Sequence, residues 1–138
     1  MAIWYLDTSA MAKLVRTEHE TAALRRWLRG KRWIVSDLHR TELRRAAARV
    51  GALASARADR LLAESDVIRV TAEVFDDAGR LQPPDLRSLD AVHLAAAMAL
   101  GPDLAGIVAY DERLAAAAVA AGLRVSSPAP RPSSNREP

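Results

Sequence analysis

Short apolar runs alternate along the chain with longer segments that have a helical spacing of apolar residues. The short runs, at residues 3–6, 33–35, 67–70, 106–110 and 123–125, predict β-strands. The longer segments predict helices over residues 9–28 (interrupted near 17–19), 36–50, 53–64, 71–81, 88–100 and 112–121. Ser36 and Thr71 are the expected N-caps of two of these helices, and Gly51 and Gly122 the expected stops of two.

The predicted strands are short and apolar on both faces. This is typical of a parallel sheet that helices cover on both sides. We therefore expect a three-layer α/β/α sandwich around a central parallel sheet of four to five strands. The 138 residues suffice for one such domain, which is predicted to span residues 1–126. Residues 127–138, rich in Pro, Ser and charge, are predicted to form a disordered tail.

Charge and cysteine content narrow the setting. Charged residues make up 27 % of the chain. No apolar run approaches the roughly 20 residues that cross a bilayer, so a membrane protein is not expected. No export signal is recognisable, and the lack of Cys excludes disulfides and thiolate metal sites, which favours a reducing, cytoplasmic setting. The net charge of +3, carried mainly by Arg, is compatible with a polyanionic partner.

Two acidic residues directly follow predicted strands. Asp7 follows the first strand, and Asp111 follows the fourth, in GIVAYDERL. In an open parallel sheet, ligands bind beyond the carboxyl ends of the strands, so both acids occupy positions where active sites form. Each also stands where a helix N-cap is expected, and capping alone explains a single Asp there. Two acids at one edge of the sheet favour a functional site.

Two further acids lie on predicted helices. Asp90 is in the first turn of a helix that is apolar nearly all round, in LRSLDAVHLAAAMAL. Such a helix should be buried, and a buried carboxylate needs a partner such as a metal ion, although complementing the helix dipole is the alternative. Glu42 lies about two turns into its helix, where pairing with Arg45 or Arg49 on an exposed face is the alternative to a role in a site.

The acids and their neighbours occur in a specific order. The chain has YLDTSA near its start, then Glu42 on the helix after the second strand, then LRSLDAVHLAAA and AYDERLAAAA. This order resembles the PIN-domain nucleases, most closely the VapC-type ribonuclease toxins of bacterial VapBC toxin–antitoxin pairs. The resemblance covers residues 1–126. It implies an acidic cluster of Asp7, Glu42, Asp90 and Asp111, with Ser9 at the small hydroxyl position and Thr8 between. Tyr110 departs from the pattern, since a small or hydroxyl residue more often precedes the last acid.

Converging carboxylates cannot all stay ionised without a cation, because like charges raise one another's pKa. Oxygen ligands without Cys suit Mg²⁺ or Mn²⁺ better than Zn²⁺. By this chemistry and by the resemblance, metal ligation is assigned to Asp7, Asp90 and Asp111. Glu42 is expected to position a water or a second ion, and Ser9 to orient a ligand. The reaction implied is metal-dependent hydrolysis of RNA.

His93 and several arginines complete the candidate chemistry. His93, one turn after Asp90, is either a general base or, as is more usual on an apolar helix, a packed core residue bonded to backbone. Arg87 and Arg113 adjoin Asp90 and Asp111 and are expected to hold RNA phosphates, with a solvated surface as the alternative. Four more arginines, Arg40, Arg44, Arg45 and Arg49, share the helix of Glu42.

Other classes of protein fit less well. A phosphotransfer receiver needs two acids after the first strand and a Lys near the fifth, but the only lysines are Lys13 and Lys31. A haloacid-type phosphatase needs Asp-x-Asp at the first strand, where this chain has Asp7-Thr8-Ser9. A non-catalytic binding module on the same fold stays open.

The resemblance also implies partners, namely a VapB-type antitoxin and a second copy of the chain. Apolar residues at helical spacing could form the docking faces: Met11, Leu14, Val15, Leu24, Trp27, Leu28, Leu61 and Leu62. Trp27 is the expected anchor for the antitoxin, because large aromatic residues often dominate interfaces. Ordinary core packing of these residues is the alternative.

Overall fold

The structure is a computed structural model and is described here for residues 2–132. The strands are β1 (Ile3–Leu6), β2 (Arg32–Ser36), β3 (Val67–Ile68), β4 (Leu104–Val108) and β5 (Val125–Ser126). The α-helices are α1 (Thr8–Val15), α2 (Thr21–Leu28), α3 (Leu38–Val50), α4 (Ala52–Glu64), α5 (Ala72–Gly79), α6 (Ser88–Met98) and α7 (Glu112–Ala120). A short 3₁₀ helix, η1 (Gly101–Asp103), precedes β4. No helix in this described part is long and apolar enough to cross a bilayer.

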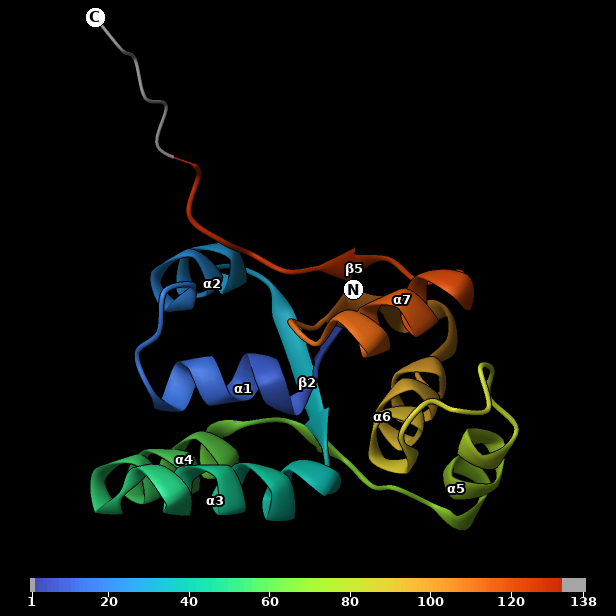
Figure 1. The fold of residues 1–138 in the computed structure, drawn as a ribbon, viewed down its shortest axis with the longest axis horizontal. Helices are drawn as coiled ribbons and strands as arrows, with labels where there is room; N and C mark the ends of the chain where they lie inside the picture. Colours follow the sequence, from blue (N-terminus) through green and yellow to red (C-terminus); the bar gives the residue numbers. More distant parts are fainter. Residues whose placement is uncertain (1, 133–138) are drawn as a thin grey trace, which may run out of the picture.

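The strands form one parallel sheet in the order β3-β2-β1-β4-β5. Figure 1 shows α1 to α4 on one side of β2, and α5 to α7 on the other. Helices cover both faces, so the predicted α/β/α sandwich is confirmed. The order also separates this chain from receiver domains, whose sheets run 2-1-3-4-5. Here β1 lies in the centre, between β2 and β4, so residues that follow β1 and β4 come out side by side.

The two halves of the core lie on opposite faces of the sheet. Alternate residues of a strand point to opposite faces, so Ile3 and Tyr5 pack with the helices α5, α6 and α7. Trp4 and Leu6 pack instead with α1 to α4. This alternation directs the Tyr5 side chain toward α6, which becomes important for the candidate site.

Side chains cap the first turns of three helices, and a fourth helix begins later than the sequence predicted. Asp7, Thr71 and Asp111 each accept a hydrogen bond from a backbone amide in the first turn of α1, α5 and α7. Ser36 was the expected N-cap of α3, and that prediction is wrong. Ser36 is the last residue of β2, and α3 begins only at Leu38, because strand pairing with β3 holds Ser36 in the sheet.

Three strands begin or end at other residues than the apolar runs predicted, because pairing with neighbouring strands decides where a strand ends. The third strand stops at Ile68 instead of residue 70, since it lies at the sheet edge and pairs only with β2. The fourth strand begins at Leu104 and ends at Val108, two residues early at each end, because it pairs with β1 from Ile3 onward. The fifth strand, predicted at residues 123–125, is only Val125–Ser126.

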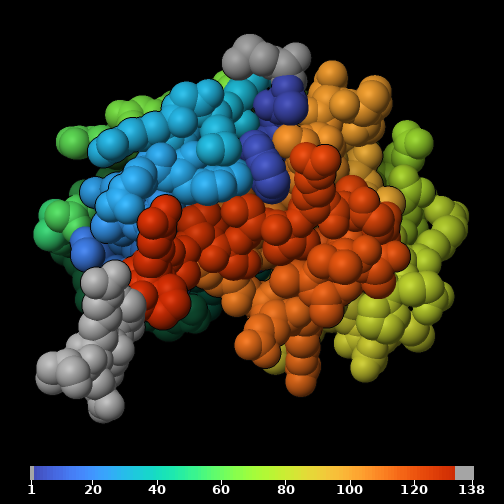
Figure 2. All heavy atoms as spheres, turned by 90° about the horizontal axis from the view of Figure 1, so that it is seen from above, coloured from blue at the N-terminus to red at the C-terminus, as the bar shows by residue number. Residues whose placement is uncertain are grey.

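The segment after β5 is tied to the domain at its start. Figure 2 shows the C-terminal stretch, in red, lying across the molecule between the blue α1–α2 region and the orange α7. Ser127 Oγ donates to the carbonyl of Ala109 (2.5 Å), and the Tyr110 hydroxyl donates to the carbonyl of Pro128 (2.6 Å). Residues 127–132 contain no helix or strand. Residues 133–138 of the predicted tail lie outside the described part, and its disorder stays a prediction.

Candidate active site

Asp7 is a buried carboxylate at the end of the central strand. Its side chain is 3 % exposed, and Oδ1 accepts from the backbone amide of Ala10 (2.9 Å) while it caps α1. Burial raises the pKa of Asp7 to about 6, although hydrogen bonds from Ser9 and Ala10 act in the opposite direction, and the charge of Asp111 raises it further. Asp7 is therefore both the helix cap and an acid that resists ionisation when no cation is bound.

Ser9 holds Asp7 against the end of β4. Its Oγ lies 2.7 Å from Oδ1 and 2.8 Å from Oδ2 of Asp7, to which it donates. The same Oγ accepts from the backbone amide of Tyr110 (3.0 Å). The predicted supporting hydroxyl thus lies beside Asp7. Because Ser9 already contacts the backbone ahead of Asp111, the Tyr110 side chain need not supply a hydroxyl there.

Glu42 points inward, where Thr8 and His93 bind it. Its Oε1 accepts from Thr8 Oγ1 (3.0 Å) and lies 2.5 Å from His93 Nε2. The alternative of pairing with Arg45 or Arg49 is not seen. Burial alone would raise the pKa of Glu42, but the hydrogen bonds from His93 and Thr8 outweigh it, so the pKa is lowered. Glu42 is held as a carboxylate in a partly buried position.

Behind His93 lies a polar group in the core that the sequence did not indicate. The Tyr5 hydroxyl lies 2.7 Å from His93 Nδ1 and donates to Ser36 Oγ (2.9 Å). The His39 ring packs edge-on against His93 with centroids 4.8 Å apart. Its Nδ1 accepts from the Ser36 amide, so Nε2 carries the proton and donates to the Leu6 carbonyl (2.7 Å).

The structure corrects one of the two readings of His93 from sequence, that of a packed core residue bonded to backbone. It is buried, at 2 % exposed, yet it bonds side chains and not backbone. The sequence did not indicate this group, whose members are Tyr5, Ser36 and His39. Tyr5 lies in a strand that looks apolar, and no recognisable motif contains His39. A polar hydroxyl inside a buried strand was the available signal, since such groups require a partner.

Asp90 and Asp111 lie at the first turns of α6 and α7. Asp111 caps α7 by accepting from the Leu114 amide (2.9 Å). Asp90 has no capping bond and is half-buried, not buried as its helix predicted. Partial burial raises the pKa of Asp90, and the charge of Asp111 adds to the shift, with a smaller contribution from Glu42. The acids therefore belong to one electrostatic neighbourhood.

The acids do not form a ready-made metal cage. Within residues 2–132, no three acidic or histidine side chains converge closely enough to hold an ion as they stand. Their chemistry nevertheless fits a hard divalent cation, because every candidate ligand atom is an oxygen. Burial and the neighbouring acid Asp111 also raise the pKa of Asp7, so a bound cation would stabilise its charged form. The assignment of Asp7, Asp90 and Asp111 as ligands stays a prediction.

The arginines divide into paired and unpaired ones. Arg40 binds Asp37 (3.2 Å) and Arg44 binds Asp59 (3.0 Å), so these two side chains are engaged on the surface. Within the described residues, no ion pair involves the remaining four candidates, Arg45, Arg49, Arg87 and Arg113.

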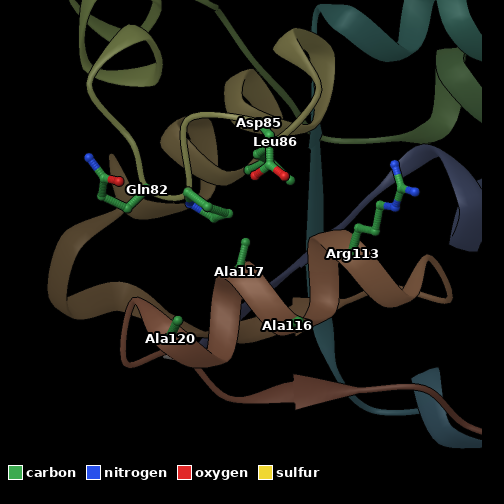
Figure 3. Close-up of a pocket in the computed structure, with 8 residues that line it drawn as sticks. Gln82, Asp85, Leu86, Arg113, Ala116, Ala117 and Ala120 are labelled. Carbon is green, nitrogen blue, oxygen red and sulfur yellow. The ribbon is translucent and has the colours of Figure 1, made fainter.

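A cleft of about 650 Å³ lies between α7 and the loop before α6 (Figure 3). One wall is α7, where Ala116, Ala117 and Ala120 leave room because their side chains are small. The opposite wall is the loop from Gln82 to Leu86, which leads into α6 and Asp90. Arg113 lies in the first turn of α7, close in sequence to Asp111, and Asp85 lies across the cleft from Ala117 in Figure 3. The cleft therefore runs between α7 and the loop that precedes α6.

Most of the apolar residues expected at a docking face lie in the core. Met11, Val15, Leu24 and Leu62 are buried. Trp27 is half-buried, packing edge-on against Trp4 with centroids 4.7 Å apart. Exposed apolar side chains occur elsewhere: Val50, Leu53, Phe75, Leu89, Met98 and Val119.

Known proteins with similar sequences and folds identify the family. The PIN domain model matches residues 4–120. Ribonuclease VapC46 of Mycobacterium tuberculosis is 46 % identical over 129 residues, covering 93 % of this chain and 99 % of that protein. Ribonuclease VapC47 of the same species is 41 % identical over 130 residues, covering 90 % and 96 %.

A solved structure agrees in fold. Mycobacterium tuberculosis VapC20, a sarcin–ricin loop cleaving toxin, superposes with a TM-score of 0.69 at 21 % identity and covers 88 % of this chain and 96 % of its own. Membership of the family implies the use of a divalent metal in general. The chain belongs to the PIN-domain family, and its similarity is to the VapC ribonucleases.

Proposed function

We propose that this protein is a metal-dependent endoribonuclease and the toxin of a type II toxin–antitoxin pair. Asp7 carries the proposal: a carboxylate 3 % exposed, at the end of the central strand of a PIN-domain chain, with its pKa raised by burial and by Asp111. Such a group favours a cation over a proton as its partner near neutral pH. RNA as the substrate rests on the ribonuclease relatives and suggests a cytoplasmic site of action.

Mg²⁺, or Mn²⁺ in its place, is the proposed cofactor, with Asp7, Asp90 and Asp111 as its ligands. When bound, it would activate water and neutralise charge on the phosphodiester. Ser9 would hold Asp7 in orientation through both carboxylate oxygens. Glu42, fixed at Oε1 by Thr8, would orient the attacking water through its second oxygen.

The cleft between α7 and the loop before α6, which Arg113 lines, is the proposed path of the RNA strand. Arg113 at its mouth has no ion pair among the described residues, so its guanidinium can bind a phosphate without first breaking a contact. Arg87, directly before α6, borders Asp90 and is the second candidate. Arg113→Gln should weaken RNA binding and lower its salt dependence by about one phosphate contact. Arg80→Gln is the control, since Arg80 is an exposed residue paired with Asp77.

A VapB-type antitoxin is the proposed partner, as VapC toxins pair with VapB antitoxins. The exposed pair Val50 (48 %) and Leu53 (67 %) at the α3–α4 turn suits an apolar segment. Leu53→Asp should weaken antitoxin binding, while Val119→Asp, equally exposed on α7, should not. Trp27→Ala tests the earlier expectation, and normal binding by that variant would remove Trp27 as the anchor.

A homodimer is also proposed, through the exposed apolar side chains of Phe75 on α5 and Leu89 on the adjoining α6. Both side chains are about half exposed, at 50 % and 49 %. The mass in solution, compared between the native chain and Phe75→Ser, tests this. A monomer at micromolar concentration would contradict the dimer but leave the ribonuclease proposal standing.

Cleavage of total RNA by the purified chain tests the proposed function. We expect cleavage with Mg²⁺ and none with excess EDTA, and none by Asp7→Asn under either condition. No metal-dependent difference between the native chain and Asp7→Asn would leave a non-catalytic module as the better description.

A further inference from the structure

We propose that His93 is a positioning residue that fixes the Glu42 carboxylate, and that Tyr5 and Ser36 fix His93 in turn. The proposal rests on the ribonuclease function above. It assigns a role to a series of hydrogen-bonded side chains, from Tyr5 and Ser36 in the sheet through His93 to Glu42 at the candidate site. These side chains come from β1, β2, α6 and α3, four elements that meet only in the folded protein.

Neither ring nitrogen of His93 is free to act as a base. Nε2 lies 2.5 Å from Glu42 Oε1 and 3.2 Å from Thr8 Oγ1, and Nδ1 lies 2.7 Å from the Tyr5 hydroxyl. The side chain is 2 % exposed, so the ring is closed off from solvent in this structure. A general base needs a nitrogen within hydrogen-bond reach of the substrate proton, and here both His93 nitrogens contact protein side chains.

The support behind His93 is rigid. Tyr5 is fully buried in the central strand, and its hydroxyl donates to Ser36 Oγ on the neighbouring strand (2.9 Å). The His39 ring packs against the face of His93 and is fixed by backbone at both nitrogens. No buried side-chain polar atom within residues 2–132 lacks a partner, so both ring nitrogens of His93 are satisfied in the orientation observed.

Glu42 receives two donors on the same oxygen. His93 approaches Oε1 from α6 and Thr8 approaches it from α1, while no hydrogen bond among the described residues engages Oε2. One oxygen is thus anchored and the other is left for the site. Removing an outer hydrogen bond that orients a functional carboxylate lowers activity on the order of 10- to 100-fold. We expect the loss of His93 to act at this scale, through kcat and with little change in KM.

Cleavage kinetics of single and double variants test the coupling. His93→Ala should lower kcat by on the order of 10- to 100-fold. His93→Gln, whose amide can donate near the position of Nε2, should recover part of the loss. The double variant Glu42→Gln/His93→Ala should be no slower than Glu42→Gln alone. If His93 acts only by orienting the Glu42 carboxylate, its loss has no further effect once that carboxylate is gone. Additive losses in the double variant would overturn the proposal. His19→Gln, an exposed histidine outside the network, is the matched control and should cleave normally.

Tyr5→Phe keeps the core packing and removes only the hydroxyl, so it is a milder test of the support behind His93. We expect it to lower kcat by a smaller factor than His93→Ala and to cause no further loss in the His93→Ala background. Equal losses from Tyr5→Phe in both backgrounds would show that Tyr5 does not act through His93.

Nitrogen-15 NMR of the histidine rings gives a readout independent of catalysis. His93 Nε2 should carry a slowly exchanging proton with a strongly downfield signal, and Glu42→Gln should shift it upfield while the His39 signals change less. An unaffected signal would refute the contact. A protein without ribonuclease activity but with this NMR response would overturn the proposed function and keep the Glu42–His93 contact.

Discussion

The backbone amide of Tyr110 donates to Ser9 Oγ (3.0 Å), joining residues 101 positions apart in the chain. The same Oγ donates to both carboxylate oxygens of Asp7. One hydroxyl therefore links Tyr110, two residues beyond β4, to the acid directly after β1, across two neighbouring parallel strands. It fixes the spacing between Asp7 and the start of α7, where Asp111 lies.

Ser9→Ala should reduce both stability and cleavage. The variant leaves the Tyr110 amide without its partner and frees Asp7 to rotate. A fully buried unsatisfied donor costs about 1–3 kcal/mol, and this bond is part-buried, so we expect the free energy of unfolding to fall by about 1 kcal/mol. Urea unfolding measures the stability and an RNA cleavage assay the activity. Ser9→Thr retains the hydroxyl and should preserve most of both. A Ser9→Thr variant as impaired as Ser9→Ala would show that the hydroxyl is not what matters.

Asp7→Asn should stabilise the metal-free protein increasingly as pH rises. Burial raises the pKa of Asp7 from 3.8 to about 6. A group with a raised folded pKa favours folding fully below its unfolded pKa, and this contribution is lost as pH rises through 4 to 6 and above. Asn keeps an oxygen for the cap and carries no charge. The stability difference, variant minus native, should therefore grow between pH 4 and pH 7 by up to about 3 kcal/mol.

The measurement is urea unfolding in EDTA at several pH values across that window. Asp76→Asn, at an exposed position on α5, is the matched control. A stability difference for Asp7→Asn that does not vary with pH would contradict the raised pKa.

Asp90→Ala and Asp111→Ala should separate catalysis from stability. Both are expected to abolish cleavage. Asp111 caps α7, so its replacement by Ala should also cost about 1 kcal/mol of stability, whereas Asp90 caps nothing and its removal relieves repulsion from Asp111. Thermal unfolding in EDTA compares the two, and Asp111→Asn should restore the cap but not the activity. Near-normal cleavage by Asp90→Ala in Mg²⁺ would remove it from the site.

Metal exchange should follow the oxygen donors of the site. Activity lost in EDTA should return with Mg²⁺ or Mn²⁺ and return poorly with Zn²⁺, because Zn²⁺ prefers nitrogen and sulfur ligands. The assay is cleavage of one RNA after dialysis and stepwise addition of each ion. Full cleavage in excess EDTA would contradict a metal mechanism altogether.

The sequence by itself determined the layers of the fold and the positions of the acids. Period-two and helical patterns reflect which faces are buried, so they predicted the alternation of strands and helices well. They located strand ends less well, because ends depend on the partner strand: β3 and β4 stop where their neighbours stop pairing. Ser36 resembled an N-cap locally, yet sheet pairing kept it in β2.

Only the tertiary structure decided how the polar side chains are partnered. Glu42 had an obvious surface partner in sequence, but α3 turns it toward His93 and Thr8. Tyr5 reads as apolar until β1 and α6 pack together and bring its hydroxyl to His93 Nδ1. These contacts span 34 to 88 residues. Local patterns carry no information over such separations, because the contacts arise from the packing of elements and not from the chain between them.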